Sequence, residues 1–326
     1  MKKLSLDEIR GSSTEAIELG LRRREFSLLQ SLGCHKLRAE MNLTGFVCRT
    51  IVFFAGLSRR RRSKDAGWPL TAQRRIGGLL RKVAPVEVVG DFPHPEHGMA
   101  LGFNHPSLGE ILRFIHISIN TYGYKRNLYP VNLPWYEALV PIVDVLEDCG
   151  IYIMPIITPS TKSKMAKALD SERMEIVKTL TNGFNARYIK ACGEFAKSGD
   201  NIWLAPSATR QRSVFKNDAC CSGTEKIEPQ TMSLLASSVA RTKVEAFDFY
   251  PVAAVPPKNF GRGLNLFKTY QVTFGKPIPI TIAKEKAHER KFEHLFLTKI
   301  AHMLIGMHAS YLILPDDTDD GTKPSA

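Results

Sequence analysis

The sequence predicts an α/β fold with a mostly parallel mixed sheet flanked by helices, preceded by a basic N-terminal helical region. After Pro85, short apolar runs alternate with helical stretches, which is typical of strands joined by helical crossovers. The 326 residues are 44% hydrophobic and 24% charged, an ordinary globular composition. We therefore expect a basic helical region over 1–84, an α/β domain over 85–310 and a disordered acidic tail over 311–326.

The N-terminal region has helical periodicity. Ser12 and Glu15 stand at capping-box spacing and predict a helix start. Thr71 is the expected cap of a helix over 72–83, whose basic residues lie off its apolar face. Apolar residues recur at a helical period at Ile17, Leu21, Leu28, Leu29 and Leu32.

The region after Pro85 contains β-rich and helical segments in alternation. The predicted strands are 86–90, 99–104, 127–131, 151–157, 201–206, 247–255 and 270–275. The predicted helical segments are 107–119, 134–148, 163–198, 229–241 and 283–308.

Positive charge is concentrated near the N-terminus. The net charge is +13, and residues 1–90 hold 18 basic and 8 acidic side chains, about +10 of that total. Such a segment attracts an anionic partner, either nucleic acid or phospholipid headgroups, unless it is simply a soluble basic surface. No RNA-binding signature or aromatic-interleaved basic run is present, so we expect no nucleic-acid partner.

The longest apolar stretch, 43–57, is followed by the charge run 59–64. It contains Arg49 and has about 15 residues, fewer than the roughly 20 of a membrane-spanning helix. It is either a helix resting on a bilayer surface or a buried core helix. Because the six cysteines show no paired spacing and no signal peptide is recognisable, we expect a reducing compartment, cytoplasmic or peripheral on a membrane, and no secretion.

Several kinds of chemistry are excluded by missing motifs. The chain has no GxSxG, no Walker P-loop, no GxGxxG and no HExxH. His94 and His97 lie in a proline-rich loop without a third ligand, so no metal site is expected.

A candidate catalytic pair lies in the segment Asn104-His-Pro-Ser-Leu-Gly-Glu110. Two other histidines are followed by an acid five positions later, His35/Glu40 and His288/Glu293, but both pairs fall inside predicted helices. His105 instead follows a predicted strand and precedes a helix, the usual place for sites in open α/β sheets. Glu110 could hold the His105 tautomer while Nε2 takes a proton from a hydroxyl. The alternative is a helix-capping histidine with a surface glutamate.

A second candidate segment runs from Pro206 to Arg212. A predicted strand leads into Pro206-Ser-Ala-Thr-Arg-Gln-Arg, a turn of small residues with Arg210 and Arg212. Backbone amides in such a turn and the guanidinium forks suit phosphate oxygens. The two segments together predict acyl transfer to a hydroxyl of a phosphate-bearing acceptor, unless these arginines are solvated.

On these residues the sequence resembles the glycerolipid acyltransferase superfamily, which includes glycerol-3-phosphate and lysophosphatidate acyltransferases. Asn104, His105 and Glu110 match its first block, and the segment 205–210 matches a later block. Tyr250–Pro256 matches a fourth, a short strand ending near a proline. The Pro-Ser form of the later block is closest to the soluble plastid-type glycerol-3-phosphate enzymes. The family usually has Asp where Glu110 stands, and its membrane-bound members usually have Glu-Gly where Ser207-Ala208 stand.

The resemblance implies His105 and Glu110 as the catalytic pair. It also implies that Arg210, Arg212, Lys162 and Lys164 bind the acceptor phosphate, with Asn104, Pro206, Ser207 and Thr209 supporting the motifs. The donor would be acyl-CoA or an acyl-carrier protein, and no metal or further cofactor is implied. Peripheral membrane contact is expected.

Two other functions remain open from the sequence. A basic membrane-binding protein with a degenerate acyltransferase scaffold would explain the charge. Acylation of a non-glycerol acceptor, such as an amino-acid lipid or a sugar lipid, would use the same catalytic pair.

Overall fold

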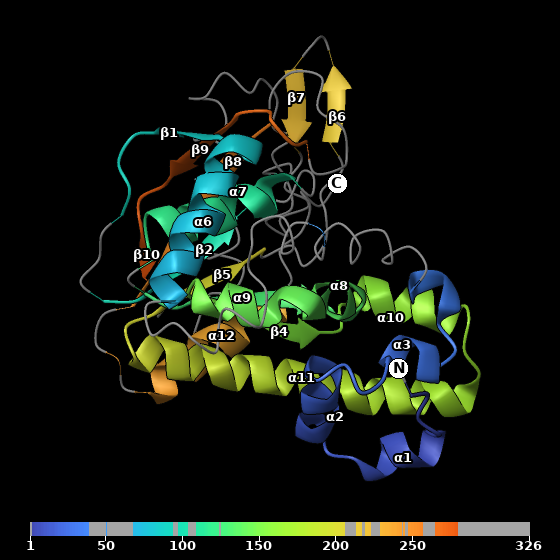
Figure 1. The fold of residues 1–326 in the computed structure, drawn as a ribbon. Helices are drawn as coiled ribbons and strands as arrows, with labels where there is room; N and C mark the ends of the chain where they lie inside the picture. The colour runs from blue at the N-terminus through green and yellow to red at the C-terminus, as the bar shows by residue number, and fades with distance from the viewer. Residues whose placement is uncertain are drawn as a thin grey trace, which may run out of the picture. The chain divides into compact units, whose positions relative to one another are not determined.

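The computed structural model (Figure 1) describes residues 2–38, 50, 68–93, 97–103, 109–123, 125–205, 213–216, 219–222, 229–242, 244, 247–256 and 265–279. The chain divides into two compact units, Met1–Leu79 with Ile117–Trp203, and Leu80–His116 with Leu204–Ala326. The predicted fold class is confirmed, because the strands form a mostly parallel mixed sheet with flanking helices. The domain division expected from the sequence stays a prediction.

The predicted strands are all present, and their ends differ from the expected ones by two residues or fewer. The strands are β1 (Val86–Val89), β2 (Met99–Phe103), β3 (Asn127–Asn132), β4 (Ile151–Ile156), β5 (Asn201–Leu204), β6 (Ser213–Lys216), β7 (Ala219–Ser222), β8 (Asp248–Val255), β9 (Tyr270–Phe274) and β10 (Ile278–Pro279). Three of them were not expected: β10, and β6 and β7, which pair as an antiparallel ribbon.

Within the described residues the predicted helical segments contain helices, but the helix Leu6–Gly11 was not expected, and two helices begin four residues before their expected starts, at Trp68 and at Pro159. The helices are α1 (Leu6–Gly11), α2 (Thr14–Arg22), α3 (Leu28–Ser31), α6 (Trp68–Val83), α7 (Gly109–Asn120), α8 (Leu133–Leu139), the 3-10 turn η1 (Val140–Ile142), α9 (Val143–Asp148), α10 (Pro159–Ala166), α11 (Ser171–Lys197) and α12 (Pro229–Arg241). The predicted helix 283–308, the apolar stretch 43–57 except Thr50, the charge run 59–64 and the tail 311–326 lie outside the described residues.

In the first unit, β3 lies between β5 and β4, and all three strands are parallel. The long helix α11 packs against β4 and β3. Asn127 fixes the start of this sheet, because its Oδ1 accepts from Asn201 Nδ2 at 3.2 Å and from the buried Trp203 Nε1 at 3.0 Å. Parallel strands place their carboxyl ends at one edge, so the segments after β3, β4 and β5 leave the sheet at the same edge.

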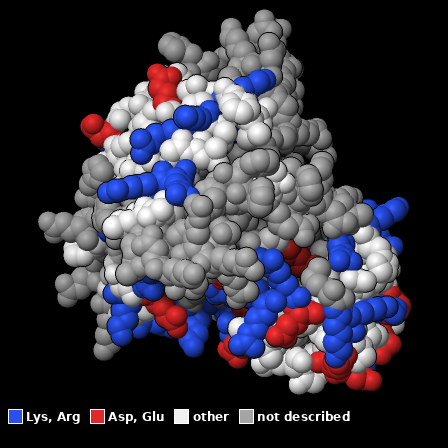
Figure 2. Space-filling view, in the orientation of Figure 1, with Lys and Arg blue, Asp and Glu red and all other residues white. Residues whose placement is uncertain are grey.

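The N-terminal helices α1 and α2 pack against α11, and much of their charge is paired. Arg187 of α11 contacts both Glu15 and Glu18 of α2, and Arg10 of α1 donates to Glu172 at 2.7 Å. Figure 2 shows the resulting mixture of basic and acidic side chains over these helices. Ion pairs at the protein surface contribute about 0–1 kcal/mol each, so we expect apolar packing to provide most of the stabilisation of this contact.

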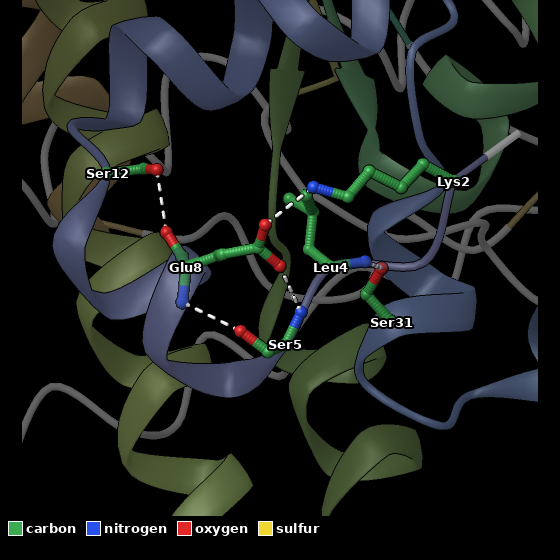
Figure 3. Close-up of polar contacts among 6 residues, drawn as sticks. All are labelled: Lys2, Leu4, Ser5, Glu8, Ser12 and Ser31. Atoms are coloured by element: carbon green, nitrogen blue, oxygen red, sulfur yellow. Dashed lines mark hydrogen bonds and ion pairs between the residues drawn. The ribbon is translucent and has the colours of Figure 1, made fainter.

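The capping box predicted at Ser12 and Glu15 is wrong. Ser13 is the N-cap of α2 and accepts from Ala16 N at 3.1 Å, whereas Ser12 ends α1 and donates to Glu8 O at 2.7 Å. The capping box belongs to α1, where Ser5 and Glu8 exchange hydrogen bonds of 3.1 and 2.7 Å (Figure 3). Ser31 of α3 then accepts from Leu4 N, which joins the first residues to α3.

Helix α6 begins three residues before the expected cap, so Thr71 lies inside it and the predicted cap is wrong. The predicted faces are confirmed. Ile76 and Leu80 are buried, whereas the basic side chains are exposed at Arg74, Arg75, Arg81 and Lys82.

In the second unit, β9 lies between β1 and β8, and β2 pairs with the other side of β8. The β1–β9 and β2–β8 pairs are parallel, and the β8–β9 pair is antiparallel. Gly102 of β2 allows the ring of Phe249 to lie against its backbone, since a Cβ at position 102 would stand 2.0 Å from Phe249 Cζ. This close fit joins β2 to β8 directly before the candidate site.

Candidate active site

The segment with the predicted catalytic histidine is bounded by the elements that the sequence predicted. The five positions of β2 are all buried, and α7 begins at Gly109. Asn104 and His105 lie between them, outside the described residues. The strand-to-helix context is therefore confirmed, and the direction of the imidazole stays a prediction.

Glu110 stands in the first turn of α7, and its exposed fraction is 0%. A solvated surface glutamate is thus excluded. Full burial of a carboxylate is costly unless charged or polar partners compensate. Its helical position places it near the unsatisfied amides and the positive end of α7, which favour a negative charge.

Arg113, one turn further along α7, is a charged residue of this region that the sequence analysis missed. It is also 0% exposed, and it is the lone charged side chain among apolar residues of the α7 sequence after Glu110. Its guanidinium donates to Gly109 O at 2.9 Å and to the backbone oxygens of Asn265 and Lys268 at 2.7 and 2.5 Å. A single charged residue in an otherwise apolar helix was the signal in the sequence that could have identified Arg113.

Electrostatics connect the two charged residues of α7. Burial lowers the pKa of Arg113, and the neighbouring Tyr270 and Glu110 oppose that shift. The guanidinium carbon lies 4.2 Å from the centroid of the Tyr270 ring. Arg113 therefore supplies the buried positive charge that a buried Glu110 carboxylate needs.

His116 is a second buried titratable residue of α7. Its Nδ1 lies 2.9 Å from Ala84 O, and because a carbonyl oxygen only accepts, Nδ1 donates this hydrogen bond. Burial lowers the pKa of His116; the hydrogen bond to Ala84 opposes this shift, and the positive charges of Arg81 and Arg113 add to it. We interpret it as a structural histidine that fastens α7 to the segment before β1.

The predicted phosphate-binding arginines follow β5. That strand is buried along its whole length and ends at Leu204. Pro206, Ser207, Thr209, Arg210 and Arg212 lie outside the described residues, and β6 begins directly after them. The predicted context of a strand followed by a connecting segment is present, and the roles of these side chains stay predictions.

Lys162 and Lys164 lie on α10, which begins just after the carboxyl end of β4. Lys164 is exposed and Lys162 half-buried. Thr158 caps this helix by accepting from Thr161 N, and Asn132 at the end of β3 donates to both threonine hydroxyls, at 3.2 and 2.5 Å. The helix bearing the lysines is thereby fastened to the edge of the sheet.

Metal and membrane-spanning features were also sought within the described ranges. In those ranges no group of three or more His, Cys, Asp or Glu side chains could hold a metal ion. No described helix is long and apolar enough to cross a membrane.

Comparisons with known proteins find similarity among solved structures. No protein-family model matches the chain, and no curated protein matches it. The crystal structure of the 1-acyl-sn-glycerophosphate (LPA) acyltransferase PlsC from Thermotoga maritima is similar, with a TM-score of 0.42, 12% sequence identity and coverage of 84% of this chain and 97% of that chain. At these values the likeness assigns neither function nor site residues.

Proposed function

We propose that the chain is an O-acyltransferase that moves an acyl group from a thioester to a hydroxyl. The observation that carries this proposal is the fully buried Glu110 in the first turn of α7, directly after the connection that holds His105. A buried carboxylate placed there suits the orientation of an imidazole base, which a surface glutamate would not do.

In the proposed reaction, His105 Nε2 takes the proton of the acceptor hydroxyl, and Glu110 accepts the Nδ1 hydrogen. The alkoxide attacks the thioester carbon and forms a tetrahedral intermediate. Its collapse breaks the carbon–sulfur bond, and the leaving thiolate takes the proton held by His105. The products are an ester and a free thiol, and no protein nucleophile is acylated.

Within this proposal Arg113 is a positioning residue. Its bond to Gly109 O fastens the first residue of α7, and its charge compensates the Glu110 carboxylate in a buried environment. Through Glu110 it would keep the imidazole in the tautomer with Nε2 free to accept a proton.

The acceptor proposed is glycerol-3-phosphate or a lysophospholipid. Arg210 and Arg212 would bind the phosphate through bidentate hydrogen bonds, and Lys162 and Lys164 would add positive charge. The donor proposed is acyl-CoA or an acyl-carrier protein.

An acceptor screen tests this function. The full chain is incubated with a long-chain acyl-CoA, and thiol release is followed with glycerol-3-phosphate, a lysophospholipid, glycerol, and non-glycerol hydroxyl acceptors. We expect release to depend on an acceptor bearing both a hydroxyl and a phosphate. Arg210→Ala should raise the acceptor KM by about 10- to 150-fold, the equivalent of a charge-assisted hydrogen bond. Release without any acceptor requirement would contradict the proposal.

A further inference from the structure

We propose that the 265–269 turn, together with the last turn of α6, docks onto the surface of an anionic lipid bilayer. The proposal does not depend on the function proposed above, because it concerns binding in the absence of substrate. It rests on three observations: the exposed apolar side chains of Leu266 and Phe267, which we call the tip, the strained backbone of Phe267, and the basic residues that adjoin the tip.

The tip consists of two apolar side chains that the fold leaves in solvent. Phe267 is 72% exposed and Leu266 is 40% exposed. Among the large hydrophobic side chains of the described residues, Phe267 is the most exposed. An aromatic side chain in this position contributes little to the core, and it is available to enter the interfacial layer of a bilayer.

The backbone of Phe267 adopts a conformation that a bulky residue rarely adopts. Its φ is +62°, in the left-handed region that glycine and asparagine accept readily. A strained residue whose side chain is not buried gains no packing energy in return. Backbone strain of this kind clusters at functional sites of proteins.

Hydrogen bonds fix the conformation of the 265–269 turn. Phe267 N donates to Val83 O at 2.8 Å, and Asn265 Nδ2 donates to the Tyr270 hydroxyl at 2.9 Å. The buried Arg113 donates to the backbone oxygens on both sides of the tip, those of Asn265 and Lys268. The tip is therefore presented in a fixed direction, so binding requires little ordering of the chain.

Basic residues adjoin the backbone segments that form the tip. Phe267 N bonds to the carbonyl of Val83, which directly follows Arg81 and Lys82; both are exposed in the last turn of α6, and Lys268 of the turn itself is exposed. Figure 2 shows lysine and arginine side chains on the face where α6 lies. The acidic Glu87 of β1 is nearby in the sheet and accepts a hydrogen bond from Gln271 at 3.2 Å. Basic residues around an apolar tip complement anionic headgroups above an acyl layer.

An anionic bilayer fits this combination better than nucleic acid or an acidic protein. Nucleic acid offers phosphates but no acyl layer for Leu266 and Phe267. A stable protein interface needs a broad contact area, whereas a few side chains with basic neighbours suffice for reversible interfacial binding.

The first test compares binding of the full chain to vesicles of phosphatidylcholine with and without phosphatidylglycerol. Phe267→Asn should weaken binding to the anionic vesicles about tenfold, because it removes the apolar anchor. The same change should raise Tm, because asparagine relieves the strained φ. Leu19→Gln is the matched control: Leu19 is 46% exposed on α2, and its replacement should leave binding unchanged.

The second test reverses one charge. Lys82→Glu should weaken binding to anionic vesicles about tenfold at low salt and less at high salt. The control is Lys197→Glu, which makes the same change at another exposed lysine in the last turn of a helix, α11. It should have a much smaller effect.

The third test places a fluorophore at the tip. In Phe267→Trp, the added tryptophan should be quenched by vesicles of brominated phospholipid, whereas the one in Leu19→Trp should not. Three results would each overturn the proposal: absence of wild-type binding to anionic vesicles, unchanged binding in both Phe267→Asn and Lys82→Glu, or equal quenching at positions 267 and 19. Loss of an acidic protein's binding in these variants, with vesicle binding intact, would assign the turn to a protein partner instead.

Discussion

The guanidinium of Arg113 lies over the face of the Tyr270 ring, with 4.2 Å between its central carbon and the ring centroid, and both side chains are 0% exposed. This pair joins α7 to the first residue of β9. It also connects two features with separate proposed roles, the buried Glu110 and the exposed 265–269 turn. A single buried cation therefore organises the second unit near the candidate active site.

Replacing Arg113 should be strongly destabilising. Arg113→Met leaves the backbone oxygens of Gly109, Asn265 and Lys268 without these donors and removes the charge that compensates Glu110. We expect the free energy of unfolding to fall by about 3–5 kcal/mol, measured by urea denaturation.

Lys178→Met is the surface control for this measurement, because Lys178 is exposed and pairs with the neighbouring Glu175 of α11. Its effect should be within about 0.5 kcal/mol. Equal effects of the two substitutions would contradict the role given to Arg113.

Glu110→Gln should lower the kcat of acyl transfer about 10²- to 10⁴-fold while the fold is retained, because the amide cannot hold the imidazole as a carboxylate does. Glu110→Asp should keep more activity than Glu110→Gln, since it preserves the carboxylate. The assay is thiol release from acyl-CoA with the acceptor in excess. Glu87→Gln, at an exposed position of β1, should retain wild-type activity. The role of Glu110 fails if the amide variant is as active as the wild type.

His116 should make stability depend on pH. Its pKa is lowered by burial, so below the ordinary value of about 6.5 the unfolded chain binds a proton that the folded chain resists. The contribution is fully present above pH 6.5 and is lost as pH falls toward the folded pKa, with a slope of up to about 1.4 kcal/mol per pH unit. Urea denaturation of the wild type and of His116→Gln between pH 7.5 and 5.5 measures it. A pH dependence that is just as steep in the variant would contradict this role.

Gly102→Ala should destabilise the β2–β8 pair by about 1–3 kcal/mol, because the new Cβ would stand 2.0 Å from a ring carbon of Phe249. Gly78→Ala offers the opposite case, since no atom lies within 4 Å of a Cβ there and α6 gains a better helix former. It should stabilise by about 0.5–1 kcal/mol. Thermal denaturation of both variants checks the prediction, and a neutral Gly102→Ala would show that β8 can shift.

The strands were predictable because buried parallel strands are short apolar runs, as in Ile151–Ile156, bounded by turn residues. Helix starts were less predictable. Adjacent serines can each cap a helix, and Ser13 rather than Ser12 is the N-cap of α2. Helix α6 extended past Thr71, since a threonine hydroxyl does not by itself end a helix.

For the candidate site, the sequence predicted the strand-to-helix context of His105 and Glu110, because that context follows from local patterns. Local patterns do not reveal partners distant in sequence. The structural role of Arg113 depends on hydrogen bonds to backbone oxygens more than 150 positions away in the sequence, those of Asn265 and Lys268. The left-handed φ of Phe267 could not be predicted from the sequence either, since phenylalanine is not a residue typical of such a turn.

One comparison decides between a catalyst and a binding protein on an acyltransferase-like scaffold. Acceptor-dependent thiol release from acyl-CoA is measured for the wild type, for His105→Ala and for His97→Ala, whose histidine is exposed outside the proposed site. We predict turnover by the wild type and by His97→Ala, and a loss of at least about 10²-fold in His105→Ala with an unchanged Tm. Turnover by His105→Ala at the wild-type rate, or no turnover by a folded wild type with any hydroxyl acceptor, would contradict the proposed function.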